Sequence, residues 1–402
     1  MGCRVVSLGD VIQLEDSKRQ PLSSRERDSR KGSYPYYGAQ GIVDYLDDYT
    51  YEGDYLLVAE DGENLRSRKQ PIANAAQGRF RVNNHAHVIA ATKRCNLTYL
   101  RHLLNSMDIT AYVTGSTQPK LSQTSLLNMK IELPEIDKQD AIAAFLHCFD
   151  AKSSTNAKLN GYLEELFATL FSELISSRNY SYVPLTDVIF FQEGPGIRNW
   201  QYVYDGGGVN FINIRCIQSH DLDLSNANQI SVEEAYGKYD RFLVKPGDIL
   251  MSSSGTLGRY AIARQEHLPL CMNTSVIRFR PLADSTAYAF VYGYLTSREF
   301  YNHLTGMANG SAQVNFGPTH LKKIEVPWPD EDTIRTFNKM TMPLIETMNA
   351  LRSESNKLAT LRDTLLPKLM SGEIDVSKVD LTQLNSHLAE CFMFTIASLS
   401  IC

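Results

Sequence analysis

The sequence lacks the features that would place it in several common classes of protein. None of its apolar runs reaches the roughly 18 residues of a membrane-spanning helix, and its N-terminus lacks the basic-then-apolar order of a secretory signal. The seven cysteines are scattered and include no Cys-x-x-Cys pair, which argues against a disulfide framework and a structural zinc. These absences favour a protein of the reducing cytoplasm with no membrane partner. At roughly 100–200 residues per domain, the 402 residues suggest two to four domains.

The motifs of common nucleotide-using and hydrolytic enzymes are also missing. A P-loop is absent, because Gly237-Lys238 is followed by Tyr239 and has no upstream glycine at the required spacing. The Ser-Ser-Ser-Gly string at residues 252–255 resembles a Gly-x-Ser-x-Gly nucleophile elbow only superficially. There is no Asn-Pro-Pro-aromatic string of an amino-methyltransferase. We therefore predict a binding protein without a catalytic site of its own.

Two short patterns suggest metal chemistry only weakly. His85 and His87 alternate as they would on one face of a strand, but no third ligand at a fixed relation to them is evident, so a polar surface or groove is favoured over a metal site. Asp150-Ala151-Lys152 resembles the end of a metal-dependent nuclease motif, but it lies inside a helical pattern without a preceding Pro-Asp pair. A solvated helix face is the favoured interpretation there. We predict no metal site in this chain.

Charge alone gives little support for nucleic acid as a partner. The chain carries 40 basic and 45 acidic residues, a net charge of -5, and no segment is strongly basic, whereas nucleic-acid binders usually present a basic face. Cations are densest in residues 16–33, which also contain acidic residues. We interpret this segment as a solvated, partly mobile loop, with a phosphate-tracking loop as the alternative. Its cations are Lys18, Arg19, Arg25, Arg27, Arg30 and Lys31.

The strongest feature of the sequence is an internal duplication. Its period of about 195 residues is far longer than the roughly 20–50 residues of solenoid repeats, so it indicates a duplicated domain. Two similar domains usually give a pseudo-twofold molecule. We favour two similar sites that face a partner with two halves over a duplication without functional consequence. The matching segments are residues 53–57 and 247–251, residues 114–118 and 309–313, and residues 127–134 and 321–327.

Each copy has the same order, a strand-rich globular part followed by a long helix. The globular parts are rich in Tyr, Phe, Val and Ile with frequent Gly and Asn, which indicates mixed strands and turns. Alternating polar and apolar residues before Pro134 and Pro327 predict a last strand that each proline ends.

The helical segments, residues 137–177 and 331–371, carry apolar residues at steps of four and three, the a/d pattern of a coiled coil. A helix of about 40 residues is about 60 Å long and cannot bury such a stripe on one small domain. We therefore expect the two helices to pack as an antiparallel coiled coil, and not each on its own domain. The stripe consists of Ile142, Leu146, Phe149, Leu163, Phe167, Leu170, Phe337, Leu344, Met348, Leu351, Leu358, Leu365 and Leu369.

Four further residues bear on these helices. Asn156 and Asn160 fall on the stripe, where a buried amide can fix the register of a coiled coil at some cost in stability. Pro343 and Pro367 lie inside the second helical pattern and are expected to kink or end that helix.

Several strings in this order resemble one known family. They are the run Tyr34–Tyr45, residues 247–250 followed by Ser254–Arg259, the Gly-Ser-x-Gln strings at Gly115–Gln118 and Gly310–Gln313, and the C-terminal string Leu365–Ile374. In this order, and with the middle strings present twice, they resemble the specificity subunits of type I restriction–modification systems. The resemblance covers about residues 3–378, nearly the whole chain.

The resemblance implies a function and a set of partners. Each globular part would be a target recognition domain that reads one half of a split, non-palindromic site in double-stranded DNA. The two helices would set the spacing of the half-sites and dock two methyltransferase subunits, which methylate adenine with S-adenosylmethionine. Restriction subunits that use ATP and Mg would join this core in the cytoplasm. The chain itself would hold no catalytic residue, metal or cofactor.

The predicted fold class is α+β, with two target recognition domains of mixed strands and helices in a pseudo-twofold repeat, separated by two long helices that form an antiparallel coiled coil. The predicted segments are the first target recognition domain at residues 1–135, a central helical spacer at 136–178, the second target recognition domain at 179–330, a C-terminal helical spacer at 331–378 and an apolar tail at 379–402.

The side chains expected to read DNA are polar residues in loops and beside glycines, with an ordinary turn or surface role as the alternative for each. In the first domain they are Tyr37, Gln40, Asn64, Arg66, Arg68, Lys69, Asn74, Gln77, Arg79, Arg81, Thr117, Gln118 and Lys120. In the second domain they are Arg198, Asn199, Asn213, Arg215, Ser253, Ser254, Thr256, Arg259, Asn273, Asn309, Ser311, Gln313 and Asn315.

The C-terminal end departs from the family pattern, because residues 391–402 form an apolar tail that is too short to span a bilayer. Packing on the helices, pairing between chains and a rearranged reading frame are open explanations for it. Two other classes of function also stay open. A stand-alone nuclease or methyltransferase with an unrecognised site would show turnover with metal or S-adenosylmethionine, and a coiled-coil adaptor would bind proteins without selecting a DNA sequence.

Overall fold

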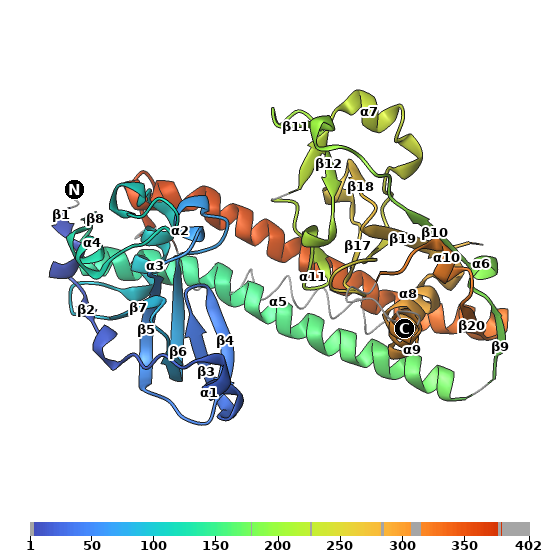
Figure 1. The fold of residues 1–402 in the computed structure, drawn as a ribbon, viewed down its shortest axis with the longest axis horizontal. Helices are drawn as coiled ribbons and strands as arrows, with labels where there is room; N and C mark the ends of the chain where they lie inside the picture. The colour runs from blue at the N-terminus through green and yellow to red at the C-terminus, as the bar shows by residue number, and fades with distance from the viewer. Residues whose placement is uncertain are drawn as a thin grey trace. The chain divides into compact units, whose positions relative to one another are not determined.

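The computed structural model describes most of the chain, and every structural statement below concerns the described residues. These are residues 4–177, 179–225, 227–282, 285–306, 315–376 and 379. They divide into two compact units, and each unit is described by itself (Figure 1). The first unit contains the described residues of Met1–Lys152 and Leu358–Ala389, and the second contains those of Ser153–Lys357. The first unit is therefore assembled from two segments that lie far apart in the sequence.

The first unit contains eight strands, four short helices and part of each of the two long helices. Its strands are β1 (Arg4–Ser7), β2 (Gln13–Leu14), β3 (Lys31–Gly38), β4 (Gly41–Leu46), β5 (Tyr51–Ala59), β6 (Ala73–Val82), β7 (Ala86–Ala90) and β8 (Lys130–Leu133). Its short α-helices are α1 (Ser24–Asp28), α2 (Asn64–Ser67), α3 (Leu97–Ser106) and α4 (Gln123–Asn128), and its 3-10 turns are η1 (Leu8–Asp10), η2 (Asp16–Lys18) and η3 (Thr110–Tyr112). The long helices are α5 (Ile136–Ser176) and α11 (Glu331–Ser371).

The second unit has shorter strands and more turns. Its strands are β9 (Ser181–Pro184), β10 (Ile189–Glu193), β11 (Tyr202–Val203), β12 (Val209–Ile212), β13 (Ile217–Gln218), β14 (Asp221–Leu222), β15 (Asn228–Ile230), β16 (Ile249–Ser252), β17 (Tyr260–Ile262), β18 (Leu270–Met272), β19 (Val276–Pro281) and β20 (Glu325–Trp328). Its helices are α6 (Leu185–Val188), α7 (Val232–Tyr236), α8 (Tyr288–Thr296), α9 (Arg298–Gly306) and α10 (Pro318–Leu321), and its 3-10 turns are η4 (Asn199–Gln201), η5 (Ile214–Cys216), η6 (Asp240–Phe242), η7 (Gln265–His267) and η8 (Ser285–Ala287).

One sheet and one strand pair recur in both units, as the duplicated sequence predicted, and the second unit adds a four-stranded sheet in the order β11-β15-β12-β18 and the pair β13-β14. The first unit has a six-stranded sheet in the order β2-β7-β5-β6-β3-β4, and the second has a four-stranded sheet in the order β10-β19-β16-β17. The second order matches the first four strands of the first, with β5 containing residues 53–57 and β16 containing the last three residues of the matching segment 247–251. A separate two-stranded pair also recurs, as β1-β8 and as β20-β9. The predicted fold class of mixed strands and helices with two long helices is confirmed.

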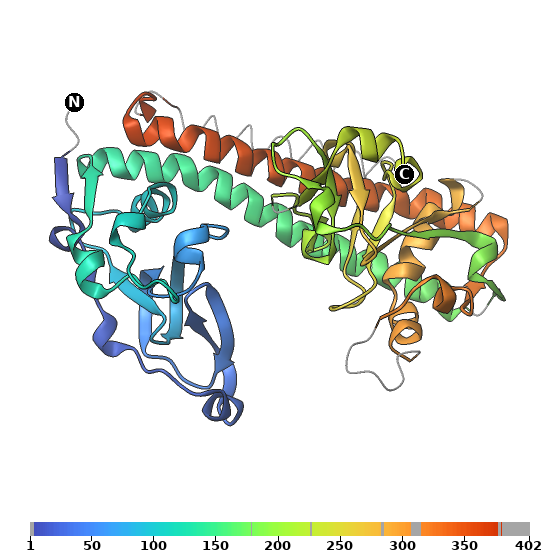
Figure 2. The same cartoon turned by 45° about the horizontal axis from the view of Figure 1, so that its top comes forward.

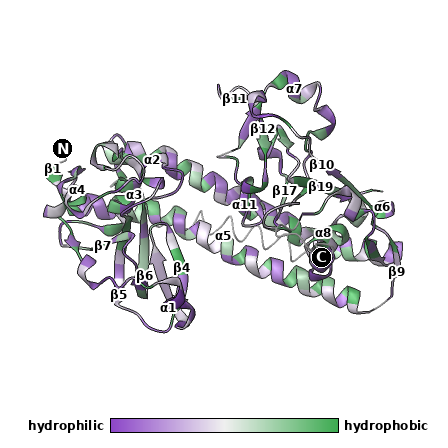
Figure 3. Cartoon of the chain, in the orientation of Figure 1, coloured by the Kyte–Doolittle hydropathy of each residue, from purple (hydrophilic) through white to green (hydrophobic). Residues whose placement is uncertain are grey.

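The two long helices pack on each other within each unit, and their apolar bands can be followed in Figure 3. In the second unit, the Nδ2 atom of Asn156 donates to Glu354 Oε2 at 2.7 Å, while Phe167 packs on Phe337 with 5.8 Å between ring centroids. Residue numbers rise along one helix as they fall along the other, so the helices run antiparallel there, as predicted. In the first unit, the side chain of Arg362 donates to Asp150 Oδ1 at 3.0 Å. Figure 2 shows α5 and α11 side by side within each unit.

The stripe residues of these helices form the centre of two hydrophobic cores. Most of them are fully buried, and Leu170 and Leu365 are partly buried against the same cores. The core of the first unit joins side chains of α5 and α11 to β5, α3 and α4, and that of the second unit joins them to β16, β19 and α8. The globular part of each unit therefore closes its core on a segment from each long helix.

Two expectations about prolines need correction, namely that a proline could end the second helix and that Pro327 ends a strand. Pro343 and Pro367 do not end the second helix, since α11 is continuous over 41 residues. Lys339, whose carbonyl loses its helical N–H partner at Pro343, is exposed, so water can satisfy that oxygen. The strand before Pro134 ends as predicted. Strand β20 instead continues through Pro327 to Trp328. Among the described strands it pairs only with β9, and an edge strand tolerates a proline, which has no N–H, on its unpaired side.

Among the described residues, none of the helices combines the length and the apolar character that a membrane span requires.

Replacing Phe167 by Ala is expected to lower the free energy of unfolding by about 3–5 kcal/mol, because its buried ring packs on Phe337 and on Tyr292 and leaves a cavity when removed. Leu166→Ala is the matched control, since Leu166 is adjacent in sequence but 46% exposed, and should change stability by no more than about 0.5 kcal/mol. Denaturant unfolding of the purified chain measures both. Equal losses in the two variants would contradict the burial pattern of α5.

Candidate nucleic-acid interface

In the second unit, most of the predicted DNA-reading residues gather at one edge of the strands. Strands β10, β12, β16 and β18 all end at this edge, and β19 begins there. The last residue of β16, Ser252, pairs with the first residue of β19, Val276. Strand β12 runs parallel to β18, so these two strands end on the same side. The segments that follow these strand ends are Gly194–Asn199, Asn213–Arg215, Ser253–Arg259 and Asn273–Ser275. We call this set of segments the loop edge.

Backbone hydrogen bonds hold the segments of the loop edge together. The backbone N–H of Ser253 donates to the carbonyl oxygen of Ser275 at 2.9 Å, and that of Asn273 donates to Ile212 at 2.9 Å. The backbone N–H of Phe316 donates to Ser253 at 3.0 Å, which brings the exposed Asn315 beside the same edge. Main-chain contacts therefore join the segments of the loop edge, and buried or half-buried side chains add further bonds to their backbone.

One glycine is required by a close approach at this edge. A Cβ atom on Gly194 would lie 2.3 Å from the carbonyl oxygens of both Met272 and Asn273, which no side chain can occupy. Gly194 therefore allows the chain that leaves β10 to cross directly over the end of β18.

The loop edge presents cations that are free to bind an anion. Arg198, Arg215 and Arg259 are exposed, and among the described residues none of them forms an ion pair with a carboxylate. Glu193 at the end of β10 is half-buried, and burial raises the pKa of its carboxyl group. Unpaired guanidinium groups in loops can contact phosphates or the O6 and N7 atoms of guanine.

Not every predicted residue of the second domain is available at the loop edge. Ser253 is buried and its hydroxyl donates to the carbonyl oxygen of Thr274 at 3.3 Å, so its role is structural. The side-chain oxygens of Asn213 and Asn273 accept backbone N–H groups in local turns. Asn199, Ser254 and Thr256 are at least partly exposed there. Predicted residues Asn309, Ser311 and Gln313 lie outside the described residues.

The first unit has a corresponding group beyond the end of β5. Arg66 donates to the carbonyl oxygens of Gly115 and Ser116, the latter at 2.9 Å, and so ties α2 to the segment at residues 114–120. The predicted residues Thr117, Gln118 and Lys120 are exposed on that segment, and Lys69 is exposed beside α2. Thr117, Gln118 and Lys120 thus share one exposed segment, and Arg66 positions that segment through backbone contacts.

Three predicted residues of the first domain serve the fold. Arg81 is 1% exposed and pairs with Asp48 while it donates to Gln20. Asn64 is buried and exchanges hydrogen bonds with the backbone of Gln70, and Arg68 donates to the carbonyl oxygens that end α3. Arg81 and Asn64 are buried and cannot reach a base, and the half-buried Arg68 has its Nη2 atom held by three backbone carbonyls, so the prediction of a DNA-reading role for these three residues is corrected.

The remaining predicted residues of the first domain are spread over the sheet. Gln40 is exposed in the turn between β3 and β4, and Tyr37 is half-buried against Phe80, with 5.5 Å between ring centroids. Asn74, Gln77 and Arg79 lie along β6, opposite Leu57, Asp54 and Glu52 of β5. Arg79 pairs with Glu52 at 3.0 Å.

The basic segment at residues 16–33 is neither a mobile loop nor a free cationic surface. It forms η2, α1 with a Ser23–Glu26 capping box, and the start of β3. Carboxylates already pair with most of its cations, so it has little charge left for phosphates. The pairs are Lys18 with Glu15, Arg19 with Glu60, Arg27 with Asp44, Arg30 with Asp47, and Lys31 with Asp44.

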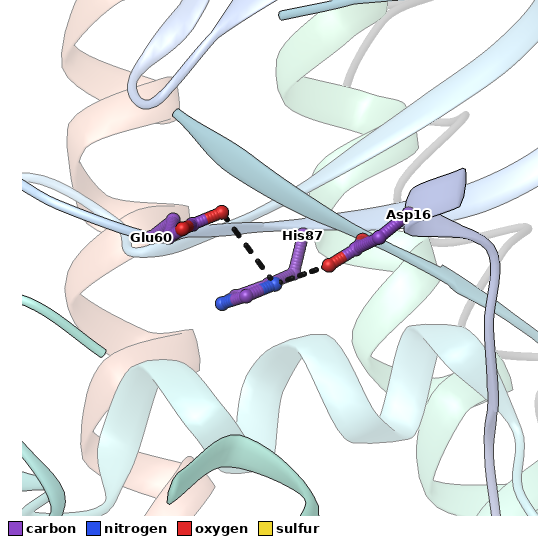
Figure 4. Close-up of side chains that lie close together, drawn as sticks. All are labelled: Asp16, Glu60 and His87. Carbon is purple, nitrogen blue, oxygen red and sulfur yellow. Dashed lines mark hydrogen bonds and ion pairs between the residues drawn. The ribbon is translucent and has the colours of Figure 1, made fainter. Parts of the chain in front are cut away.

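One group with metal-ligand chemistry lies in the first unit, where Asp16, Glu60 and His87 converge (Figure 4). His87 Nδ1 lies 2.6 Å from Asp16 Oδ2, and its Nε2 lies 2.8 Å from the carbonyl oxygen of Leu121, to which only an N–H can donate. Arg19 pairs with Glu60 at 2.6 Å. Both ring nitrogens of His87 are thus hydrogen-bonded, and the carboxylates of Asp16 and Glu60 are paired with His87 and Arg19. The three residues therefore fit an ion-pair network and do not fit a metal site.

This network corrects the interpretation of the two histidines. His85 is exposed and pairs with Asp61 at 2.8 Å, as a polar surface would predict, but His87 is buried within the network. Asp150, the first residue of the nuclease-like string, likewise pairs with Arg101 and Arg362 and links α3, α5 and α11. It is a structural carboxylate and not a free surface group.

Trp200, which is not among the predicted DNA-reading residues, follows Arg198 and Asn199 and is 81% exposed. A tryptophan beside a glycine-rich segment, Gly206-Gly207-Gly208, is the signal that could have identified it.

Comparison with known proteins assigns the family. The family model described as "Type I restriction modification DNA specificity domain" matches residues 2–165 and again 178–339. The chain therefore belongs to this family, as its repeated motifs predicted, and has the two-domain organisation of a specificity subunit.

Individual relatives agree with this assignment. A Haemophilus influenzae chain with the provisional name of a type I restriction enzyme specificity subunit is 31% identical over 63% of this chain, and the match spans 66% of its own length, just under two thirds. The MjaVIII type I specificity subunit of Methanocaldococcus jannaschii is 20% identical over 94% of each chain. The crystal structure of a type I S subunit from M. genitalium has a similar fold, with a TM-score of 0.55 over 92% of this chain and 96% of that one at 18% identity.

The ion-pair network makes a prediction about pH. Burial raises the pKa of Asp16, but hydrogen bonds from His87 and the Val88 backbone outweigh it and hold the pKa below the ordinary 3.8. For Glu60, burial is likewise outweighed by Arg19, and the pKa lies below 4.5. Both carboxyl groups therefore have a lower pKa in the folded chain than in the unfolded chain. Their ionised forms stabilise the fold above the ordinary pKa values, and this stabilisation is lost as the pH falls through the folded-state pKa values.

Thermal unfolding between pH 7 and pH 3 tests this, with Asp16→Asn as the variant. Below about pH 4.5 the wild type should lose more stability than Asp16→Asn. The variant lacks one of the two carboxyl groups whose pKa is lowered by folding. Asp28→Asn is the matched control on an exposed carboxylate. Parallel curves for wild type and Asp16→Asn would contradict the network.

Proposed function

We propose that this chain is the DNA specificity subunit of a type I restriction–modification complex, in which each recognition domain reads one half of a split, non-palindromic DNA site. Phosphate contacts position such a reader and base-edge contacts provide sequence selection. The two domains differ in their exposed side chains, so the two half-sites differ in sequence.

The loop edge of the second unit is the observation that carries this proposal. It combines unpaired arginines with exposed Asn, Ser and Thr side chains on a rigid main-chain frame. Such a set matches the mixed phosphate and base contacts of DNA recognition. The exposed segment at residues 114–120, together with Lys69, supports the same role for the first domain.

The long helices support a role as spacer and docking platform. Each is continuous over 41 residues, about 60 Å at 1.5 Å per residue, so a rigid pair can keep two half-sites at a constant separation. The stripe residues are buried within the chain. Two methyltransferase subunits would therefore dock on exposed apolar residues of the same helices, such as Tyr162, Leu166 and Met340.

The chemistry belongs to the partners in this proposal. This chain is a non-catalytic, cytoplasmic subunit that binds no cofactor or metal itself. S-adenosylmethionine is held by the methyltransferase subunits, and ATP and Mg by the restriction subunits. The net charge of -5 is compatible with DNA binding if the methyltransferase subunits contribute much of the phosphate clamp.

Arg259→Ala and Arg215→Ala are expected to weaken DNA binding by the complex with methyltransferase subunits several-fold each. If each guanidinium neutralises one phosphate, the slope of log affinity against log salt should fall in magnitude by about one per variant. Fluorescence anisotropy across a salt series measures this. Lys238→Ala removes the same charge from an exposed position outside the loop edge and is the matched control. Unchanged salt slopes in both arginine variants would argue against phosphate contacts at the loop edge.

Co-expression with the methyltransferase subunit of the same system tests the assignment as a whole. We expect a stable complex, and genome-wide mapping of methylated adenines should yield one split motif with a constant gap. Exchanging residues 179–330 for those of a relative should change one half of the motif and preserve the other. A complex that methylates no split motif would contradict the proposed function.

A further inference from the structure

Trp200 and Tyr204 are the most exposed large hydrophobic side chains among the described residues, at 81% and 83%. Both lie on the segment that joins β10 to β12 (Figure 1). This segment begins at the loop edge with Gly194, whose backbone lies against Asn273. It is thus a direct continuation of the proposed DNA-binding surface.

The segment holds Trp200 on a rigid base. The next residue, Gln201, is buried, and its side chain accepts the backbone N–H of Arg198 at 2.9 Å while it donates to Glu234 at 2.8 Å and to the hydroxyl oxygen of Tyr239 at 3.1 Å. Strand β11 follows at once and pairs with β15. Because the buried and fully hydrogen-bonded Gln201 anchors this 3-10 turn, the exposed residues of the turn are held in a fixed direction.

The outward residues of this turn combine three complementary chemistries. Arg198, Asn199 and Trp200 are consecutive and all exposed, and they supply a cation, an amide and a flat aromatic ring. Arg198 has no ion pair among the described residues. The nearby carboxylate of Asp205 is folded back onto the backbone N–H of Gly207 at 3.0 Å.

We propose that Trp200 is a wedge that stacks against a base step of the half-site read by the second recognition domain and partly unstacks it. Arg198 contacts the flanking phosphate and Asn199 a base edge. This inference rests on the proposed function of the chain. Apolar and aromatic wedges of this kind open a base step and bend the duplex, so that selection also depends on how easily the DNA deforms.

The observations favour DNA over a protein partner for this turn. Trp200 follows an unpaired guanidinium and an amide, the groups that contact phosphates and base edges. Its segment is also continuous with the loop edge, where Arg215 and Arg259 are unpaired.

The test uses the complex with methyltransferase subunits and duplexes that carry the mapped motif, with 2-aminopurine placed stepwise through the second half-site. Wild type should raise 2-aminopurine fluorescence at one step. Trp200→Ala should abolish that rise and weaken binding about 10-fold, the change that 1.4 kcal/mol produces. Trp200→Phe should restore much of both signals. Tyr182→Ala, which removes a 56% exposed aromatic of the same unit, should leave both unchanged.

The possible outcomes separate this proposal from the one on which it rests. Unchanged affinity and fluorescence with Trp200→Ala, in a wild-type complex that methylates a split motif, would overturn the wedge and leave the specificity function standing. Loss of complex assembly by Trp200→Ala before DNA is added would assign the turn to protein docking and also overturn it. Failure of the wild-type complex to select DNA would overturn both. Trp200→Ala should keep the wild-type melting temperature, since the ring is exposed, so misfolding is recognised separately.

Discussion

The structure depends on one constraint, which is that neither long helix can bury its apolar stripe alone. In the first unit, Ile142 and Leu146 of α5 share a core with Leu369 of α11, and in the second unit Phe167 shares one with Phe337. Each strand-rich part then completes that core with its own strands and helices. Within each unit the strand-rich part is consequently anchored to a segment of both long helices through a shared core.

The loop edge separates the frame from the side chains that we propose to read DNA. Main-chain bonds such as that from Ser253 to Ser275, and the close approach at Gly194, set the path of the loops without help from the exposed groups. Exposed residues such as Arg259 and Thr256 can therefore change without loss of the frame. A specificity subunit benefits from this arrangement, because new target sequences then require only surface substitutions.

The sequence predicted the large-scale organisation well and individual side-chain roles less well. The duplication and the heptad stripe are local or repeated patterns, and both appear in the strand orders and in the two cores. By contrast, Arg81 and Arg259 look alike in sequence, and only the position of Asp48, 33 residues away, makes Arg81 a buried structural cation. The same holds for His87, whose partners Asp16 and Leu121 come from distant segments.

The sequence by itself determined the family, the two-copy plan and the helices, because these follow from motif order and from apolar periodicity along the chain. Only the tertiary structure decided which polar groups are used for folding and which are left for a ligand. That division depends on long-range partners, since a guanidinium or imidazole that meets a buried carboxylate, as in the network of Asp16, Glu60 and His87, can no longer serve DNA. Trp200, in contrast, has no such partner among the described residues and remains exposed. The neighbouring Gln201 is buried and hydrogen-bonded, which leaves the Trp200 ring on the outer side of the turn.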